Sequence, residues 1–329
     1  MLAVVCPGQG SQTPGLLSPW LELPGVEALL DSFSDAAGVD LKAHGTTSDA
    51  ETIKDTAVAQ PLIVAASLVA LRVLLDGAAA TDVVDVTGGH SVGELAAAAV
   101  AGSLTDIGAV SLVGHRARAM AKAAAAAESG MAAVVGGDPV EVLAAIEAAG
   151  LTPANVNGGG QVVAAGSPEG LAALAANPPA KARVIPLQVA GAFHTSYMSG
   201  ARDEFAAAAQ GWDVSAPALP LLSNADGAVL GADTDGTEVL RRLVDQVASP
   251  VRWDLCQESL AARGVTGIVE LLPGGVLCGL ARRALPGVPS VAIKSPDDLD
   301  KARQLAATTS VATTSSASGS TTTEQGAAE

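Results

Sequence analysis

The sequence predicts an α/β protein with two subdomains, and two observations lead to this expectation. First, short apolar runs that end at Pro or Gly alternate with longer segments of helical periodicity, which is typical of a mainly parallel sheet with helices on both faces. Second, the expected order between residues 128 and 189 changes to β-α-β-β-α-β, the ferredoxin-like order. We therefore expect a large α/β subdomain into which a small ferredoxin-like subdomain is inserted.

The large subdomain is expected to begin with a buried strand, because Leu2 to Cys6 is apolar and the Pro7-Gly8 pair that follows is a turn signal. The next expected elements are a helix over 61–75, a strand over 83–87, a helix over 92–101, and a helix from Thr105 or Asp106 to about residue 127. Residues 1–127 and 190–303 form the large subdomain in this interpretation.

The small subdomain is expected over residues 128–189. Its strands are predicted over 131–135, 154–157, 161–165 and 183–189, and its helices over 139–149 and 168–176. Past about residue 304 the chain consists mainly of Ala, Thr, Ser and Gly. Such a composition buries too little apolar surface to offset the entropy of ordering, so we expect residues 304–329 to form a disordered tail.

Composition limits the classes of partner. The 329 residues carry 34 acidic and 18 basic side chains, a net charge of −16, which argues against binding to nucleic acid or to an anionic membrane surface. The chain opens on a strand-like run rather than a leader, and no apolar stretch has the form of a membrane span. The three cysteines are far apart and suggest no disulfide framework. We therefore expect a cytoplasmic protein, and nothing in the sequence requires more than a monomer.

The strongest local signal is Gly89-His90-Ser91-Val92-Gly93, a G-x-S-x-G between an expected strand and an expected helix. The two glycines allow a tight turn that exposes the serine oxygen at the helix N-terminus, where free N–H groups can stabilise an oxyanion. This strand–turn–helix context makes the large subdomain α/β-hydrolase-like and Ser91 a candidate nucleophile. The alternative is a tight turn in which Ser91 only caps the helix.

A serine nucleophile needs a base, and four histidines are available. His90 adjoins Ser91 and is expected to point away from it, while His115 lies inside an expected helix. His194 follows the last strand of the small subdomain, where loops of both subdomains can meet, and we favour it as the general base. The alternative is an ordinary surface histidine.

Arg116 is the most informative charge, because it lies beside the apolar stripe of its helix. An arginine half-sunk in an apolar face needs an anion, since an unpaired buried charge is costly. The alternative is that its side chain reaches past the apolar face to the surface. Thr13 stands where a dinucleotide site would have its third glycine, and no His and Cys spacing fits zinc, so we expect neither nicotinamide chemistry nor a metal.

Together these residues resemble a family, the malonyl-CoA:acyl-carrier-protein transacylases and related acyltransferase domains of fatty-acid and polyketide synthesis. The matches run in order along almost the whole chain. They are Pro7-Gly8-Gln9-Gly10-Ser11-Gln12, Gly89-His90-Ser91-Val92-Gly93-Glu94, His115-Arg116, Asn155-Val156-Asn157 with Gln161-Val162-Val163, Ala192-Phe193-His194, Ser223-Asn224, Gln246 through Trp253, and Pro273-Gly274 leading into Leu277.

The resemblance implies that a malonyl group passes from malonyl-CoA to the phosphopantetheine thiol of acyl carrier protein, through an ester on Ser91. His194 is then the base, oriented by the main-chain carbonyl of Gln246 without an aspartate. Arg116 pairs with the malonyl carboxylate, and the N–H groups of Gln9 and Val92 form the oxyanion hole. No bound cofactor is implied, because the phosphopantetheine is carried by the partner.

The resemblance also places Phe193, Asn155 and Asn157 in the substrate site, and bulk at Phe193 would crowd the α-methyl of methylmalonyl. Two positions depart from the family pattern: Leu272 stands where glycine is usual, and Gly191 replaces a histidine often found two residues before the phenylalanine. Because carrier proteins are typically acidic, a basic rim is expected to dock them. Candidates are Lys181, Arg183, Arg282 and Arg283, with scattered solubilising charge as the alternative.

Two rival functions remain open from the sequence. An α/β-hydrolase esterase or thioesterase is weakly suggested by His44-Gly45, which mimics that fold's oxyanion motif, and it requires a third acid but not Arg116. A carrier-protein-binding module with a vestigial site is the non-catalytic alternative, and it predicts that loss of the Ser91 hydroxyl leaves cellular function intact.

Overall fold

The computed structural model describes residues 1–317, with side chains through residue 309, as a mixed α/β protein with two sheets. The strands are β1 (Leu2–Cys6), β2 (Val86–Gly89), β3 (Gly130–Gly136), β4 (Thr152–Gly158), β5 (Gln161–Gly166), β6 (Ala182–Pro186), β7 (Leu221–Leu222), β8 (Val229–Leu230), β9 (Val251–Arg252), β10 (Gly267–Glu270) and β11 (Ser290–Ala292). The helices are α1 (Val26–Ala37), α2 (Leu41–Thr46), α3 (Thr56–Leu75), α4 (Gly93–Val100), α5 (Asp106–Ala126), α6 (Pro139–Ala148), α7 (Pro168–Ala176), α8 (Ser199–Ala209), α9 (Gly236–Asp245), α10 (Trp253–Ala262), α11 (Val276–Ala284) and α12 (Leu299–Ala317).

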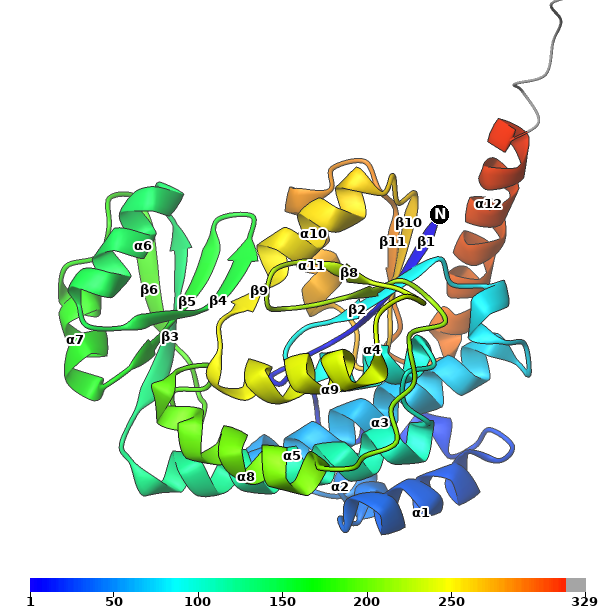
Figure 1. Ribbon diagram of the computed structural model, residues 1–329, viewed down its shortest axis with the longest axis horizontal. Helices are drawn as coiled ribbons and strands as arrows, with labels where there is room; N and C mark the ends of the chain where they lie inside the picture. The colour runs from blue at the N-terminus through cyan, green and yellow to red at the C-terminus, as the bar shows by residue number, and fades with distance from the viewer. Residues whose placement is uncertain (318–329) are drawn as a thin grey trace, which may run out of the picture.

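The larger sheet has six strands in the order β11-β10-β1-β2-β7-β8, and all its pairings are parallel except that of β7 with β8 (Figure 1). Its central strand β1 is buried on both faces, as its unbroken apolar run predicts. Leu2, Val4 and Cys6 face one apolar cluster that also holds residues of α3, α4 and α12. Ala3 and Val5 face a second cluster formed with α10 and α11. The sheet is therefore covered by helices on both sides.

The smaller sheet has five strands in the order β6-β3-β5-β4-β9. Four of them come from the element order β3-α6-β4-β5-α7-β6 and pair antiparallel. Helices α6 and α7 pack on one face through the cluster of Val134, Ile146, Val162 and their neighbours. The opposite face carries Met131, Ala133 and Val163, which point toward a cavity described below.

The fifth strand of the smaller sheet was not expected, because β9 lies outside residues 128–189. It pairs parallel to β4, with Asn155 opposite Val251. Val251 is fully buried, and α10, which begins directly after β9, also packs on β4. Burial of Val251 favours the pairing, which joins the smaller sheet to the segment that leads back into the larger one.

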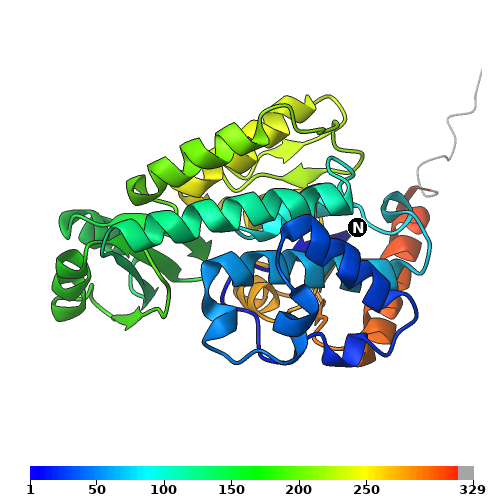
Figure 2. The ribbon, with the colours of Figure 1, turned by 90° about the horizontal axis from the view of Figure 1, so that it is seen from below.

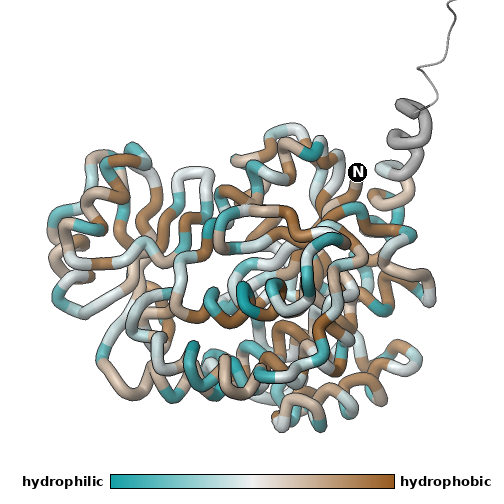
Figure 3. Tube along the Cα trace, in the orientation of Figure 1, coloured by the Kyte–Doolittle hydropathy of each residue, from teal (hydrophilic) through white to brown (hydrophobic). Residues whose placement is uncertain are grey.

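Helix α3 is apolar around its whole circumference, the pattern of a core helix or of a membrane span. Among the described residues it is the one helix long and apolar enough to cross a membrane, with a mean hydropathy of 2.1. No membrane span was expected from the sequence, and 83% of this stretch is buried inside the protein. Figure 3 shows that apolar segments gather in the interior of the molecule. Helix α3 is therefore a core helix, in the layer that covers one face of the larger sheet.

The C-terminal region differs from the expected disordered tail over 304–329, because α12 continues to Ala317. Ala302 and Ala306 on this helix are buried, and α12 contacts β10, β11 and β1. Small side chains let the helix approach the sheet closely, which compensates for its lack of large apolar residues. The rest of the expected tail, residues 318–329, lies outside the described residues.

Helix α5 connects the two sheets, since it contacts α1, α3 and α8 and ends four residues before β3 begins. Figure 2 shows it running along the molecule between the α1 side and the α8 side toward the smaller sheet. Its N-cap Thr105 accepts a hydrogen bond from the N–H of Gly108, as the sequence predicts for one of the two candidate caps. A residue on the inner face of α5 can therefore reach the space between the sheets.

Candidate active site

Ser91 lies in the turn between β2 and α4, and two glycines make this turn possible. A Cβ atom at Gly89 would lie 2.0 Å from the carbonyl carbon of Gly93, and one at Gly93 would lie 2.3 Å from the carbonyl oxygen of Cys6. Ser91 itself has φ of 53°, in the left-handed region that is strained for a residue with a side chain. The strained turn holds the serine hydroxyl at the start of α4.

His194 is within hydrogen-bond distance of the serine. Ser91 Oγ lies 2.7 Å from His194 Nε2, although the two residues are 103 positions apart. On the other side of the ring, Nδ1 lies 2.8 Å from the main-chain oxygen of Gln246. Because a carbonyl oxygen only accepts, Nδ1 carries the proton and Nε2 is free to accept from the serine hydroxyl. This is the geometry of a base and a nucleophile without a carboxylate on the histidine.

The environment keeps His194 neutral. Its side chain is buried, and burial together with the nearby Arg116 charge lowers its pKa from 6.5 to about 3. His194 also has φ of 61°, a second left-handed residue in the site. Ala192, two residues earlier, is held by a hydrogen bond from its N–H to Ser129 Oγ. Gly191 has no room for the histidine usual at that position, because an added Cβ would lie 2.9 Å from Ala124 Cβ.

Arg116 is 1% exposed and points into the site rather than past the apolar face to the surface. Its Nη1 donates to Gln60 Oε1 at 2.6 Å and its Nη2 to Gln246 Oε1 at 2.7 Å. Nη2 also lies 3.4 Å from Ser91 Oγ. Burial lowers the pKa of this guanidinium to about 10, against the attraction of Glu94. The second hydrogen of Nη1 makes no other contact, and that of Nη2 makes only the long contact to Ser91 Oγ, so the guanidinium can still donate to a carboxylate placed beside the serine.

Three side chains of the site had no role in the sequence reading. Gln60 on α3 accepts from Arg116, and Asn224, which follows β7, accepts from the Ser91 N–H at 2.8 Å and donates to the Gly89 oxygen at 2.7 Å. Glu94 on α4 is 3% exposed and accepts from the N–H of Asn224 at 2.7 Å. Glu94 and Asn224 stood inside the motifs noted above, but only the fold reveals what they contact.

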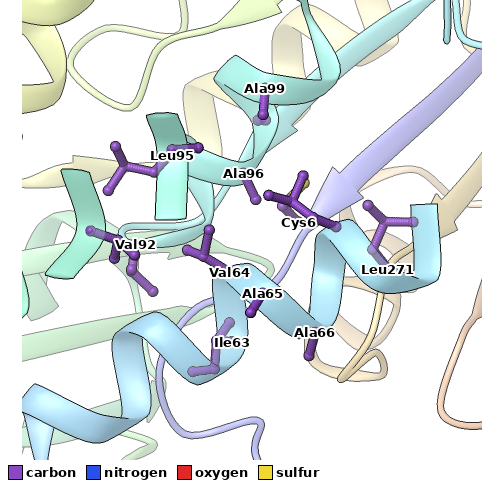
Figure 4. Packing of buried hydrophobic residues seen from close by; sticks show 14 of the residues in the cluster. Cys6, Ile63, Val64, Ala65, Ala66, Val92, Leu95, Ala96, Ala99 and Leu271 are labelled. Carbon is purple, nitrogen blue, oxygen red and sulfur yellow. The ribbon is translucent and has the colours of Figure 1, made fainter. Parts of the chain in front are cut away.

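Gln9 and Val92 were expected to contribute main-chain N–H groups. Within the described part of the chain, neither N–H donates a hydrogen bond. Val92 is the residue before α4, and its side chain packs in the core beside Val64 and Leu95 (Figure 4), so only its main chain faces Ser91. Gln9 lines the cavity from the loop after β1, and an added Cβ on its neighbour Gly8 would lie 2.8 Å from the His90 oxygen. That close approach brings the two loops together.

A cavity of about 240 Å³ opens beside Ser91 and His194 and lies between the two sheets. Its walls are mostly apolar, with Met131, Val163 and Phe193 among them. Asn155 and Asn157, both buried on β4, also line it. Asn157 Oδ1 lies 2.8 Å from His90 Nε2, which ties β4 to the nucleophile turn. Of the residues predicted for the site, Ser91, His194, Gln9, Phe193, Asn155 and Asn157 line this cavity. Arg116 and Gln246 lie behind its wall and hydrogen-bond Ser91, and Val92 follows Ser91 with its side chain in the core.

None of the four basic residues considered for docking lines this cavity, and Arg283 is one of the two that lie on α11, which contributes lining residues. It lies one turn beyond Leu280, a lining residue on α11, and its side chain packs over Gly159 in the β4–β5 turn. Lys181 and Arg183 lie at the other end of β6 from Leu187, which lines the cavity. Among described residues, no group of three or more His, Cys, Asp or Glu side chains is arranged to hold a metal ion.

The fold and this site define an acyltransferase, and comparison with known proteins agrees. A family model described as the acyl transferase domain matches residues 3–311. Among curated proteins, the malonyl CoA-acyl carrier protein transacylase of Mycobacterium tuberculosis strain H37Rv is 50% identical over 305 residues, covering 93% of this chain and all of that protein.

Solved structures extend this likeness. A crystal structure of the M. tuberculosis transacylase has a TM-score of 0.87 at 50% identity, covering 92% of this chain and 99% of that one. A malonyl-transacylase solved with its type II polyketide-synthase acyl-carrier protein has a TM-score of 0.84 at 30% identity, with coverage of 92% and 99%. The chain therefore belongs to the malonyl CoA-acyl carrier protein transacylase family.

Proposed function

We propose that this protein is a malonyltransferase that carries a malonyl group from malonyl-CoA to the phosphopantetheine thiol of acyl carrier protein, in fatty-acid and polyketide synthesis. One observation carries the proposal: a buried guanidinium lies 3.4 Å from a serine oxygen that is itself 2.7 Å from a neutral histidine. A nucleophile for acyl transfer and a binding group for a free carboxylate thus lie within hydrogen-bond distance of each other.

The first half-reaction loads the serine. Ser91 Oγ attacks the thioester carbon of malonyl-CoA while His194 Nε2 takes the hydroxyl proton. The negative charge on the carbonyl oxygen is stabilised by the N–H groups of Gln9 and Val92. Collapse of this intermediate breaks the carbon–sulfur bond, and His194 returns the proton to the departing thiolate, so that free coenzyme A leaves and a malonyl ester remains.

The second half-reaction reverses these steps with another thiol. His194 takes the proton of the carrier's phosphopantetheine thiol, whose sulfur attacks the ester carbon. The carbon–oxygen bond to Ser91 breaks, and the proton returns to the serine oxygen. Because the donor thioester and the acceptor thiol both carry their sulfur on a pantetheine arm, one apolar cavity serves both. The same walls limit attack by water on the ester.

Arg116 and Phe193 set the selectivity. The Arg116 guanidinium binds the malonyl carboxylate, with Nη2 exchanging its long contact to Ser91 Oγ for a carboxylate oxygen, and an acetyl group offers no such acceptor to this buried charge. Phe193, 6% exposed in the cavity wall, crowds the position of an α-methyl group. A single methyl is worth only about 1–3 kcal/mol in discrimination, so the barrier against methylmalonyl is lower than that against acetyl.

We further infer a cytoplasmic, monomeric enzyme without a bound cofactor, nucleic acid or membrane partner, built from an α/β-hydrolase-like large subdomain (1–127 and 190–303) and a ferredoxin-like small one (128–189). Support comes from the acidic net charge, the antiparallel β6-β3-β5-β4 order and the burial of α3. An acyl-carrier protein complex is known for a relative, and Arg283, which packs over the β4–β5 turn, is with Arg282 our first choice of docking residue ahead of Lys181 and Arg183.

Intact-protein mass spectrometry after mixing with malonyl-CoA tests the function. We expect a malonyl adduct on the wild-type chain that persists without a carrier, is discharged by holo carrier protein, and is absent from Ser91→Ala. An adduct that hydrolyses rapidly without a carrier indicates the esterase instead. No adduct on the wild-type chain under these conditions contradicts the transferase.

A further inference from the structure

Glu94 is a buried carboxylate that the mechanism above does not use. It sits in the first turn of α4, three residues after the nucleophile, and is 3% exposed. It is not among the residues that line the cavity, and, unlike Arg116, its side chain makes no hydrogen bond with Ser91 Oγ. Its two oxygens accept hydrogen bonds from different segments: the N–H of Asn224, at 2.7 Å, and Nε2 of Gln246.

The contact with Gln246 fixes which way that amide faces. Gln246 Nε2 donates to Glu94 and to the main-chain oxygen of Ser91, the latter at 2.9 Å, and its Oε1 accepts from Arg116 Nη2 at 2.7 Å. If the amide turned over, its NH2 group would face the guanidinium and its oxygen would face a carboxylate and a carbonyl. All three contacts would then be lost, so the carboxylate permits one orientation only.

The contact with Asn224 supports the nucleophile turn in the same way. The Asn224 side chain accepts from the N–H of Ser91, the strained residue, and donates to the oxygen of Gly89, the two groups that flank His90 in the turn. Glu94 holds the main chain of Asn224 in place. The Glu94 carboxylate therefore supports Asn224 and Gln246, which both hydrogen-bond the main chain of the nucleophile turn. Gln246 is also one of the two residues that accept from Arg116.

Charge adds to this geometry. No salt bridge among the described residues includes Arg116, and Glu94 is the anion whose field acts on it inside the protein. A glutamine at position 94 would remove that field, and its NH2 group would face either Gln246 Nε2 or the N–H of Asn224, so one of the two contacts would be lost. The effect on Arg116 is thus passed through the Gln246 amide.

Resting on the proposed function, we propose that Glu94 is a positioning residue for acyl selectivity: by fixing the Gln246 amide it holds the Arg116 guanidinium where the malonyl carboxylate binds. Glu94 makes no contact with substrate. Its loss affects acyl groups that carry a carboxylate more than those that do not, which a merely structural role does not predict.

The test compares single-turnover acylation of Ser91 by malonyl-CoA and by acetyl-CoA, for the full chain and for Glu94→Gln. We expect the malonyl-to-acetyl rate ratio to fall roughly tenfold to a hundredfold in the variant, as expected for misplacing a charged hydrogen-bonding partner. Equal losses for both acyl groups overturn the proposal. Failure of the proposed function is seen separately, as a wild-type chain that takes no malonyl group.

A second variant covers the case in which Glu94→Gln does not fold. Gln246→Met removes the linking amide but keeps the main-chain carbonyl that contacts His194, and it is expected to lower the same ratio to a similar extent. An unchanged ratio in Gln246→Met overturns the proposal. Where both single variants fold, Glu94→Gln added to Gln246→Met should lower the ratio no further, because residues that act through one contact are not additive. A full additional loss contradicts the coupling.

Discussion

At the scale of single residues, the site depends on polar groups that are buried and almost fully paired. Ser91 and His194 both adopt left-handed backbone conformations, and each is held there by hydrogen bonds from distant segments. Such strain persists only where the surrounding structure determines it. The nucleophile and base are therefore fixed before substrate arrives, so that little reorganisation is needed for the reaction.

Arg116→Ala is expected to slow acylation by malonyl-CoA by roughly a hundredfold or more, and acylation by acetyl-CoA far less, because it removes the binding group for the free carboxylate. Single-turnover acylation with both donors measures this. Arg118 is an exposed arginine two residues further along the same helix. Arg118→Ala is therefore the matched control and should leave both rates close to wild type. If Arg116→Ala lowers the acylation rates with both donors equally, the guanidinium does not bind the malonyl carboxylate.

Histidine 194 is expected to make the fold sensitive to acid. Its pKa is about 3 in the folded protein against 6.5 as the ordinary value. Between these values the unfolded chain binds a proton that the folded chain does not, so this residue's contribution to stability is present above pH 6.5 and is lost as pH falls toward 3. Glu94 acts in the opposite direction, because burial raises its pKa from 4.5 to about 7.

Denaturant titrations at two pH values isolate the contribution of His194 to the pH dependence of the unfolding free energy. Between pH 7.5 and 5.5 the wild-type chain should lose more unfolding free energy than His194→Gln, since the Glu94 contribution is common to both. The same loss in both proteins would mean that His194 is protonated in the folded state at pH 5.5.

At the scale of elements, the contact of α4 with β1 allows no side chain at Gly93. Gly93→Ala would place a Cβ 2.3 Å from the Cys6 oxygen, so we expect a loss of about 3 kcal/mol or more in unfolding free energy. Gly279→Ala in α11 is the control, because no atom lies within 4 Å of its added Cβ and the gain in helix propensity should stabilise by about 0.5–1 kcal/mol. Urea titrations measure both, and a neutral Gly93→Ala would contradict the close packing.

The elements and the main site residues were predictable from sequence for identifiable reasons. Helices α5 and α7 were expected within one residue of their bounds, because caps and periodicity are local signals. Ser91 and His194 were recognisable from the turn glycines and the family motifs. The roles of Gln60 and Glu94 were not, because their partners lie 56 and 130 positions away and no local pattern announces a side-chain contact. Strand β9 and the close fit of α12 were missed for the same reason.

At the scale of the whole molecule, the net charge of −16 opposes the approach of an acidic carrier, so a local basic patch has to guide it. Arg283→Glu is expected to lower the apparent affinity for holo carrier roughly fivefold, measured in the discharge of a preformed malonyl adduct. The affinity of the variant should also depend less on salt concentration than that of the wild type. Lys301→Glu on α12 makes the same change in net charge at an exposed site outside the cavity and should leave discharge unchanged. Equal effects of the two would indicate bulk charge rather than docking at Arg283.

The pairing of β9 with β4 bears on how acyl selectivity can be engineered in this family. Exchange of residues 128–189 for those of a relative would transplant the strand that receives β9 while retaining the host's Val251 and the start of α10. The two edges would then have to match by chance, and a mismatch would uncover a strand edge beside the cavity. A graft that also carries residues 251–262 keeps the β4–β9 pairing and the start of α10 together. It is therefore the shorter route to a chimera that folds with a changed substrate range.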